Sequence, residues 1–271
     1  MEIKFYKYQG TGNDFVILDN RSGDYDMLSS KLIRKLCDRR FGIGADGLML
    51  MNNKAGYDFE MIYFNSDGKA GSLCGNGGRC IVQFARDMGI SLILYSFMAT
   101  DGSHEAEIDK NNIVRIKMQD VTAVEDGNGY FILNTGSPHF IKFTSDVRNI
   151  DVVKKGKEIR YNDVFKKDGI NVNFVENINA DSIYMRTYER GVEDETFSCG
   201  TGVTAAALVS AHNDEGFNAV NVQTNGGWLS VEFTKINAHT FTDIYLCGPA
   251  KFVFAGTVNS DVFSEEKKDA C

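Results

Sequence analysis

The sequence lacks an uninterrupted apolar run of about eighteen residues, so a membrane-spanning helix is not expected. Its first ten residues, MEIKFYKYQG, include an acidic side chain and no apolar core, so they do not resemble a signal peptide. The sequence also lacks an excess of basic over acidic residues. The net charge of −8 and the pI of about 5.1 disfavour nucleic-acid binding, which needs a clustered basic surface. We therefore expect a cytoplasmic protein without nucleic-acid or membrane partners.

The cysteines and histidines also lack the spacing that is typical of metal ligands. The 271 residues include six cysteines but no CxxC pair, and the four histidines are far apart. A zinc site is therefore not expected, and in a cytoplasmic protein the cysteines should be free thiols. With 43% hydrophobic and 24% charged residues, the composition is typical of a globular protein with one large domain or two ordinary ones.

Short runs rich in Val, Ile, Phe and Tyr recur between turn residues and predict extended β-sheet. Three segments have helical spacing instead. The first can be capped by Ser29 or Ser30, the second follows Cys74 and stops near Gly89, and the third follows Cys199. The third is apolar almost all round, as a helix buried within a sheet would be. Two of the three helices thus begin directly after a cysteine.

An internal repeat relates these two cysteines. YFNSDGKAGSLCGNG lies over YERGVEDETFSCGTG at an offset of 125 residues, which matches Cys74 with Cys199 and Tyr63 with Tyr188. GNDFVIL lies over GSPHFIK at an offset of 124. Ordered matches at a nearly constant offset indicate a duplicated unit.

The repeat predicts an α+β fold with two pseudo-symmetric homologous domains. Each would be a mostly antiparallel sheet or barrel wrapped around a central helix, with the active-site cleft between the two. We expect residues 1–120 to form the N-terminal half and residues 121–250 the C-terminal half. Residues 251–271, which include KFVFAGTV, would return to complete the first half.

A cysteine at a helix N-terminus meets unpaired backbone N–H groups and partial positive charge, which lower a thiol pKa. The glycines that follow Cys74 and Cys199 let a carboxylate approach that backbone. Two such thiols on opposed domains could invert a stereocentre, because one removes a proton from one face and the other delivers a proton to the opposite face. The remaining cysteines are assigned to packing or to the polar tail: Cys37, Cys80, Cys247 and Cys271.

Six motifs together resemble the diaminopimelate epimerase family, and they cover nearly the whole chain: GTGNDFVILD, RRFGIGADGLML, FNSDGKAGSLCGNGGRC, GSPHF, YERGVEDETFSCGTG and CGPAKFVFAG. The resemblance implies interconversion of LL- and meso-diaminopimelate without a cofactor, in lysine and peptidoglycan-precursor biosynthesis. It also implies a homodimer and no metal. No lysine and phosphate-loop arrangement for pyridoxal phosphate is found, and most racemases depend on that cofactor.

The resemblance implies roles for individual residues. Cys74 and Cys199 would be the acid/base pair. The residues after them would donate hydrogen bonds to the carboxylate at the reacting end of the substrate: Gly75, Asn76, Gly200 and Thr201. A further group would hold the distal amino-acid end: Asn13, Asn65, Asn171, Glu189 and Arg190.

The chain departs from the family pattern at two positions. Ser137 stands where the family often has Asn before Pro-His, so that substrate contact would fall to a shorter hydroxyl. Gly47 stands where some members have Gln, which removes a side-chain contact. His139 is expected either beside one of the paired cysteines or satisfied by backbone.

Three alternatives remain at this point. Proline racemases and hydroxyproline epimerases also use a pair of cysteines, but they bind a ring imino acid. The YERG and GNDF elements favour a substrate with a second amino-acid end. A phenazine-biosynthesis type of isomerase shares the fold but lacks the paired thiols. A binding protein without enzymatic activity would bind a ligand without exchanging its protons.

Overall fold

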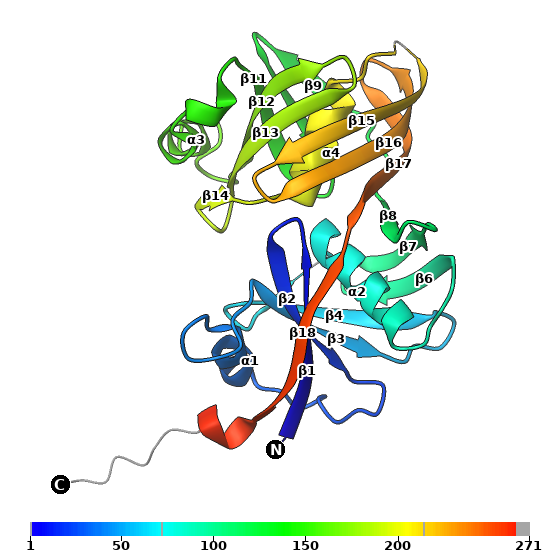
Figure 1. Ribbon diagram of the computed structural model, residues 1–271. Helices are drawn as coiled ribbons and strands as arrows, with labels where there is room; N and C mark the ends of the chain where they lie inside the picture. The colour runs from blue at the N-terminus through cyan, green and yellow to red at the C-terminus, as the bar shows by residue number, and fades with distance from the viewer. Residues whose placement is uncertain (1, 72, 214, 264–271) are drawn as a thin grey trace, which may run out of the picture.

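The computed structural model describes residues 2–71, 73–213 and 215–263. It has two bodies, one built around helix α2 and the other around helix α4 (Figure 1). The first body contains β1 (Glu2–Gly10), β2 (Asn13–Asp19), α1 (Ser30–Cys37), β3 (Gly47–Asn52), β4 (Phe59–Asn65), β5 (Ala70–Gly71), α2 (Gly75–Asp87), β6 (Leu94–Ala99), β7 (Gly102–Ile108) and β8 (Ile113–Lys117).

The second body repeats this order of elements. It contains β9 (Val124–Gly127), β10 (Tyr130–Asn134), β11 (Pro138–Phe143), η1 (Val147–Asn149), α3 (Val152–Arg160), β12 (Asn171–Asn179), β13 (Ser182–Glu189), β14 (Asp194–Thr196), α4 (Gly200–Val209), β15 (Gly216–Thr224), β16 (Gly227–Asn237) and β17 (Thr240–Pro249). The chain ends in β18 (Lys251–Asn259) and η2 (Ser260–Phe263).

The two bodies have the same strand connections. In the first, β2 is parallel to β3, β3 antiparallel to β4, and β4 parallel to β6. In the second, β11 is parallel to β12, β12 antiparallel to β13, and β13 parallel to β15. The predicted α+β fold with two similar, mainly antiparallel halves is confirmed.

Two strand features join the bodies. The C-terminal strand β18 runs from the upper body in Figure 1 to the lower one, where it pairs antiparallel with β1. Strand β8 of the first body pairs with β17 of the second. Of the stretch expected to complete the first half, residues 264–271 and with them Cys271 lie outside the described residues.

The three expected helices are confirmed. Ser29 caps α1 by accepting a hydrogen bond from the Leu32 amide at 3.2 Å. Helices α2 and α4 begin directly after Cys74 and Cys199, which are their N-cap residues. Helix α4 is buried nearly all round, in agreement with its apolar sequence.

Helix α3 was missed by the sequence analysis. Its segment VVKKGKEIR has a weak apolar face, and only Val152 and Gly156 are buried. Asp151 caps it by accepting from the Lys154 amide at 2.9 Å. Helix α3 lies between β11 and β12 as α1 lies between β2 and β3, so the repeat was the signal from which it could have been predicted.

The ladder register corrects one match of the repeat. Tyr63 pairs with Met49 between β4 and β3, and Thr187 pairs with Asn173 between β13 and β12. Tyr63 packs in the core around α2, whereas Tyr188 packs in the cluster beside α3. A shift of one residue turns a strand side chain to the other face. The structural counterpart of Tyr63 is therefore Thr187, and the match with Tyr188 is wrong.

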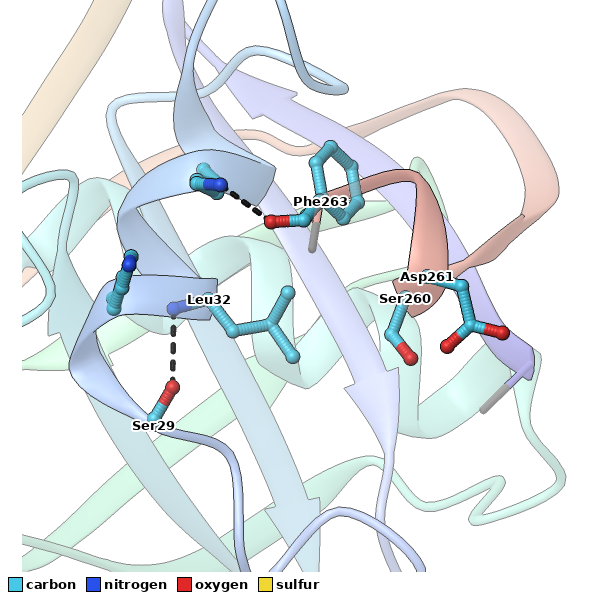
Figure 2. A pocket seen from close by; sticks show the side chains of 7 residues that line it. Ser29, Leu32, Ser260, Asp261 and Phe263 are labelled. Carbon is cyan, nitrogen blue, oxygen red and sulfur yellow. Dashed lines mark hydrogen bonds between the residues drawn. The ribbon is translucent and has the colours of Figure 1, made fainter. Parts of the chain in front are cut away.

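The end of the described chain packs on α1. Lys35 of α1 donates to the backbone carbonyl of Phe263 in η2, which is labelled in Figure 2. The pocket in this view is lined by residues of α1, its cap and η2, and it contains neither paired cysteine. In the described parts of the chain, no helix combines the length and apolar character that crossing a membrane requires.

Candidate active site

The N-termini of α2 and α4 meet where the two bodies face each other (Figure 1). A Cβ atom added to Gly200 would lie 3.4 Å from the Cα of Gly75, and one added to Gly75 would lie 3.7 Å from the Cα of Gly200. An added Cβ would also lie 2.8 Å from Cδ2 of Leu246 at Gly75 and 3.0 Å from it at Gly200, so glycine at both positions leaves room for this leucine at the junction. The caps that precede these glycines, Cys74 and Cys199, are thereby brought to one place from opposite halves.

Cys74 lies in a small network of amides. Its thiol donates to Oδ1 of Asn13 at 3.5 Å, and Nδ2 of Asn76 donates to the same oxygen at 3.3 Å. Nδ2 of Asn76 also reaches the backbone carbonyl of Ser198 in the other half at 3.0 Å. Nδ2 of Asn13 donates to a carboxylate oxygen of Asp46 at 2.6 Å. The first thiol is therefore surrounded by oriented neutral groups, with one carboxylate behind them.

Cys199 lies beside a hydroxyl and an imidazole. Its Sγ is 3.5 Å from Oγ1 of Thr201, which is 2.9 Å from Nε2 of His139. Nδ1 of His139 accepts from Nδ2 of Asn173 at 3.1 Å, and Oδ1 of that asparagine accepts from Thr187. Nε2 therefore carries the imidazole proton, and it faces two hydroxyl acceptors, Thr201 at 2.9 Å and Ser137 at 3.0 Å.

His139 is fully buried, and burial followed by the nearby Arg190 charge lowers its pKa to about 3. The imidazole is therefore neutral at neutral pH. Of the two expectations for this residue, the structure supports a place next to a paired cysteine, reached through Thr201. Its structural counterpart in the first half is Phe15, because Phe15 pairs with Gly47 as His139 pairs with Asn171.

The expectation that the helix N-termini lower both thiol pKa values is wrong for this structure. Burial raises the pKa of Cys74, the backbone N–H of Gly77 lowers it, and the Glu189 carboxylate raises it. Burial and then Glu189 also raise the pKa of Cys199, against the lowering effect of the Thr201 hydroxyl. The helix amides act in the expected direction, but removal of the thiolate from water outweighs them.

The other expected site residues lie around this centre. Nδ2 of Asn171 donates to Oγ of Ser137 at 3.1 Å, and its Oδ1 accepts from the Arg190 amide at 2.9 Å. The Ser137 hydroxyl is also 3.1 Å from Oγ1 of Thr201. Ser137 therefore links the distal residues to the Cys199 network in spite of its short side chain.

Glu189, Asn65 and the Arg190 side chain lie at the edge of this network. The Glu189 carboxylate accepts from Thr196 at 2.9 Å, and burial raises its pKa. The exposed Arg190 guanidinium donates to the Asp168 carbonyl at 3.0 Å. Asn65 is exposed at the end of β4, and within the described residues its side-chain amide has no hydrogen-bond partner.

Two residues near the site were missed by the sequence analysis. Tyr63 fills the space beside Gly47, where an added Cβ would lie 2.4 Å from its ring and 2.8 Å from its hydroxyl. Glycine at position 47, where some family members have Gln, was the signal for such a neighbour. In a packed core another side chain must fill the space that a missing one leaves. The other is Arg79, which stands inside the CGNGGRC motif and is fully buried.

Across residues 2–71, 73–213 and 215–263, no three His, Cys, Asp or Glu side chains form a group that could hold a metal ion. Cys37, Cys74, Cys80, Cys199 and Cys247 are free thiols. Cys74 and Cys199, among backbone N–H groups and neutral donors, are groups that can take up and give back protons.

Comparison with known proteins agrees with this geometry. The family model for diaminopimelate epimerase matches residues 5–124 and 131–253. A diaminopimelate epimerase of Flavobacterium psychrophilum is 48% identical over 257 residues, which cover 94% of this chain and 100% of that protein. A diaminopimelate epimerase of Chlorobaculum tepidum is 42% identical over 92% of this chain and 98% of its own length.

Solved structures share the fold at low sequence identity. A PhzF-family phenazine biosynthesis protein of Bacillus anthracis aligns with a TM-score of 0.71 at 15% identity, over 96% of this chain and 99% of its own. A probable proline racemase of Agrobacterium radiobacter aligns with a TM-score of 0.66 at 14% identity, over 95% of this chain and 93% of its own. The sequence relatives and the family model decide the assignment: this chain is a member of the diaminopimelate epimerase family.

Proposed function

We propose that the chain inverts one α-carbon of LL-diaminopimelate to give meso-diaminopimelate, with Cys74 and Cys199 as the acid/base pair. The contact between Gly75 and Gly200 carries the proposal, because it brings two cysteine-capped helix N-termini together from opposite halves. Full-length relatives named diaminopimelate epimerase support the substrate.

In the proposed reaction the two thiols share one proton. The thiolate of one cysteine takes the α-proton of the substrate and becomes a thiol. The other cysteine gives its proton to the opposite face of the carbanion and becomes the thiolate. The reverse reaction uses the same groups in exchanged roles, so the pair suits a substrate and product that differ only at the reacting carbon.

The carbanion must be stabilised by the protein, because the proposal includes no cofactor. The N–H groups at the starts of α2 and α4 are placed to receive the carboxylate next to the reacting carbon, where negative charge develops. We assign this carboxylate to Gly75, Asn76, Gly200 and Thr201. We assign the distal amino-acid end to Asn13, Asn65, Ser137, Asn171, Glu189 and Arg190.

Three further features belong to the proposal. Thiols that exchange protons must stay reduced, which fits the cytoplasm. The division into residues 1–120 and 121–250 is supported by the two matching bodies, and the completion of the first by the C-terminal stretch is supported by the β1–β18 ladder. A homodimer is supported by the exposed apolar side chains of Phe252, Val253 and Phe254 on β18, and light scattering of the purified chain tests it.

Solvent isotope exchange tests the activity. The purified chain in D₂O, without added cofactor, should place deuterium at the α-carbon of diaminopimelate and should leave proline unlabelled. Cys74→Ala and Cys199→Ala should each abolish epimerisation, whereas Cys247→Ala, a buried thiol outside the pair, should retain it. Full epimerase activity in either of the first two variants would contradict the two-thiol mechanism. Ligand binding without exchange would instead indicate a binding protein.

A further inference from the structure

Arg79 is completely buried one turn inside α2. Side chains of a helix point back toward its N-terminus, and the guanidinium accordingly lies beneath the first turn. Its Nη2 donates to Oδ1 of Asn76 at 3.0 Å and to Oγ1 of Thr11 at 3.2 Å. Nη1 reaches the carbonyl of Gly75 at 3.4 Å, and Nε reaches that of Pro249 at 3.5 Å. One side chain thus ties the cysteine-capped turn to the β1–β2 turn and to the crossover into β18.

All four acceptors are neutral. Within the described residues, Arg79 forms no ion pair with Asp or Glu. A buried cation without a counterion is costly, and proteins normally pair such a charge. Burial lowers the pKa of Arg79, and the groups that offset this effect are the thiols of Cys80, Cys74 and Cys247 rather than carboxylates. Within the described residues no carboxylate balances this charge, and the anions that can do so are an ionised thiol or a bound ligand.

The equivalent position in the second half carries an uncharged side chain, so the two halves can be compared with and without the Arg79 charge. At the offset of 125 that matches the two cysteines, the counterpart of Arg79 is Thr204. Oγ1 of Thr204 donates to the carbonyl of Gly200 at 3.0 Å, as Arg79 donates to the carbonyl of Gly75. In both halves a side chain therefore donates a hydrogen bond to the carbonyl of the first helix residue, but in α2 the donor is a cation and in α4 it is a neutral hydroxyl. A simple structural tie needs no charge at this position.

We propose that Arg79 is a positioning residue of the active site, whose buried charge is balanced by the Cys74 thiolate and the substrate carboxylate at the start of α2. Its bond to Oδ1 of Asn76 also fixes that amide, so that Nδ2 faces Asn13 and the Ser198 carbonyl. The cation stabilises negative charge on the Cys74 side of the cleft. The Cys199 side depends on the Thr201 hydroxyl and His139 instead.

Alkylation of the free enzyme tests this inference without turnover. Only the identity of the balancing carboxylate rests on the proposed function, so a chain inactive on diaminopimelate would still report on Arg79. Full-length protein is treated with iodoacetamide over a pH series, and mass spectrometry follows the Cys74 and Cys199 peptides separately. We call the pH at which a cysteine is alkylated at half its maximal rate its midpoint. Arg79→Gln should raise the Cys74 midpoint by about one unit, so that at a fixed pH below the midpoint the alkylation rate is roughly tenfold lower. The Cys199 midpoint should stay unchanged.

Two more variants complete the test. Arg79→Lys keeps the charge and should keep the Cys74 midpoint, even though loss of the guanidinium fork lowers kcat. Arg86→Gln removes a cation from the last turn of the same helix, where its Nη1 meets only Asn112, and should change neither midpoint.

If Arg79→Gln folds and leaves the Cys74 midpoint at its wild-type value, Arg79 is a structural cation and the inference is wrong. If that variant does not fold, Arg79→Lys decides, because a raised Cys74 midpoint with the charge retained also overturns the inference. Equal shifts at both cysteines would mean a general loss of structure and would count against it.

Discussion

Gly75 and Gly200 contact each other across the two halves, since a methyl group on Gly200 would lie 3.4 Å from the Cα of Gly75. The same methyl group would lie 3.0 Å from Cδ2 of the buried Leu246 in β17. Each paired cysteine directly precedes one of these glycines. The separation of the thiols is therefore set at a junction where glycine faces glycine and where an added methyl group would press on Leu246.

Gly200→Ala should lower kcat. Alanine normally favours a helix over glycine by up to about 1 kcal/mol, but here the methyl group must push Leu246 or the start of α2 by a few tenths of an ångström. A displacement of about 1 Å at reacting groups can cost about 100-fold in rate, so we expect this smaller shift to cost roughly tenfold. Steady-state kinetics check this. Shortening the obstacle in Gly200→Ala/Leu246→Val should recover part of kcat, and no recovery would locate the damage elsewhere.

Gly77 and Gly202 occupy equivalent places in α2 and α4 but should respond differently to alanine. A Cβ on Gly77 would meet Met49 and Phe15 at 3.5 Å, which is ordinary contact. A Cβ on Gly202 would lie 2.6 Å from Oδ1 of Asn173, inside the buried network that orients His139. Gly77→Ala should therefore retain activity and thermal stability, whereas Gly202→Ala should lose both. Similar behaviour of the two variants would contradict the different environments of the halves.

Much of this site follows from local signals in the sequence. The two cysteine caps can be predicted because each CGxG turn directly precedes a segment with helical spacing. The internal repeat then shows that the two caps are equivalent. Helix α3 was missed because only Val152 and Gly156 are fully buried and Val153 and Ile159 pack only partly buried, which is too weak an apolar face for a periodic signal. Comparison of the two halves, rather than inspection of VVKKGKEIR itself, would have predicted it.

Other features depend on contacts that no local pattern contains. Tyr63 was matched with Tyr188 by letter identity, but the ladder register places them on opposite faces. The thiol pKa values depend on the burial of each cysteine in the folded chain, which outweighs the effect of the helix ends. The isolated charge of Arg79 is recognised only when all its neighbours are known.

Cys80 should make the protein less stable in alkali. Burial raises the pKa of this core thiol to about 12, whereas an unfolded cysteine has a pKa of about 8.5. The raised folded-state value means that the stability is fully present below about pH 8.5 and is lost as the pH rises toward 12, because only the unfolded chain ionises. At pH 10 the loss from this group should be about 2 kcal/mol.

Urea unfolding under reducing conditions, at neutral pH and near pH 10, checks this for Cys80→Ala. The variant is less stable at neutral pH because it leaves a small cavity, but its decrease between the two pH values should be smaller than that of the wild type by about 2 kcal/mol. An equal decrease would mean that the Cys80 thiol ionises in the folded chain as readily as in the unfolded one.

His139 should have the opposite effect in acid. Its pKa falls to about 3 in the folded chain, and an unfolded histidine titrates near 6.5. A depressed folded-state value means that the stability is fully present above about pH 6.5 and is lost as the pH falls toward 3, because the unfolded chain takes up the proton first. Protonation would also turn Nδ1 into a donor facing the Asn173 amide, which itself donates.

The measurement compares wild type with His139→Gln, whose side chain does not titrate, in urea at neutral pH and near pH 5. The wild type should lose about 2 kcal/mol more than the variant over this interval, because the gap between pH 6.5 and pH 5 corresponds to about 1.5 pKa units. Equal losses would show that His139 is protonated in the folded chain at pH 5. The imidazolium would still donate from Nε2 to Thr201, but Nδ1 could no longer accept from Asn173, and the Cys199 side of the site would hold a cation like the Arg79 side.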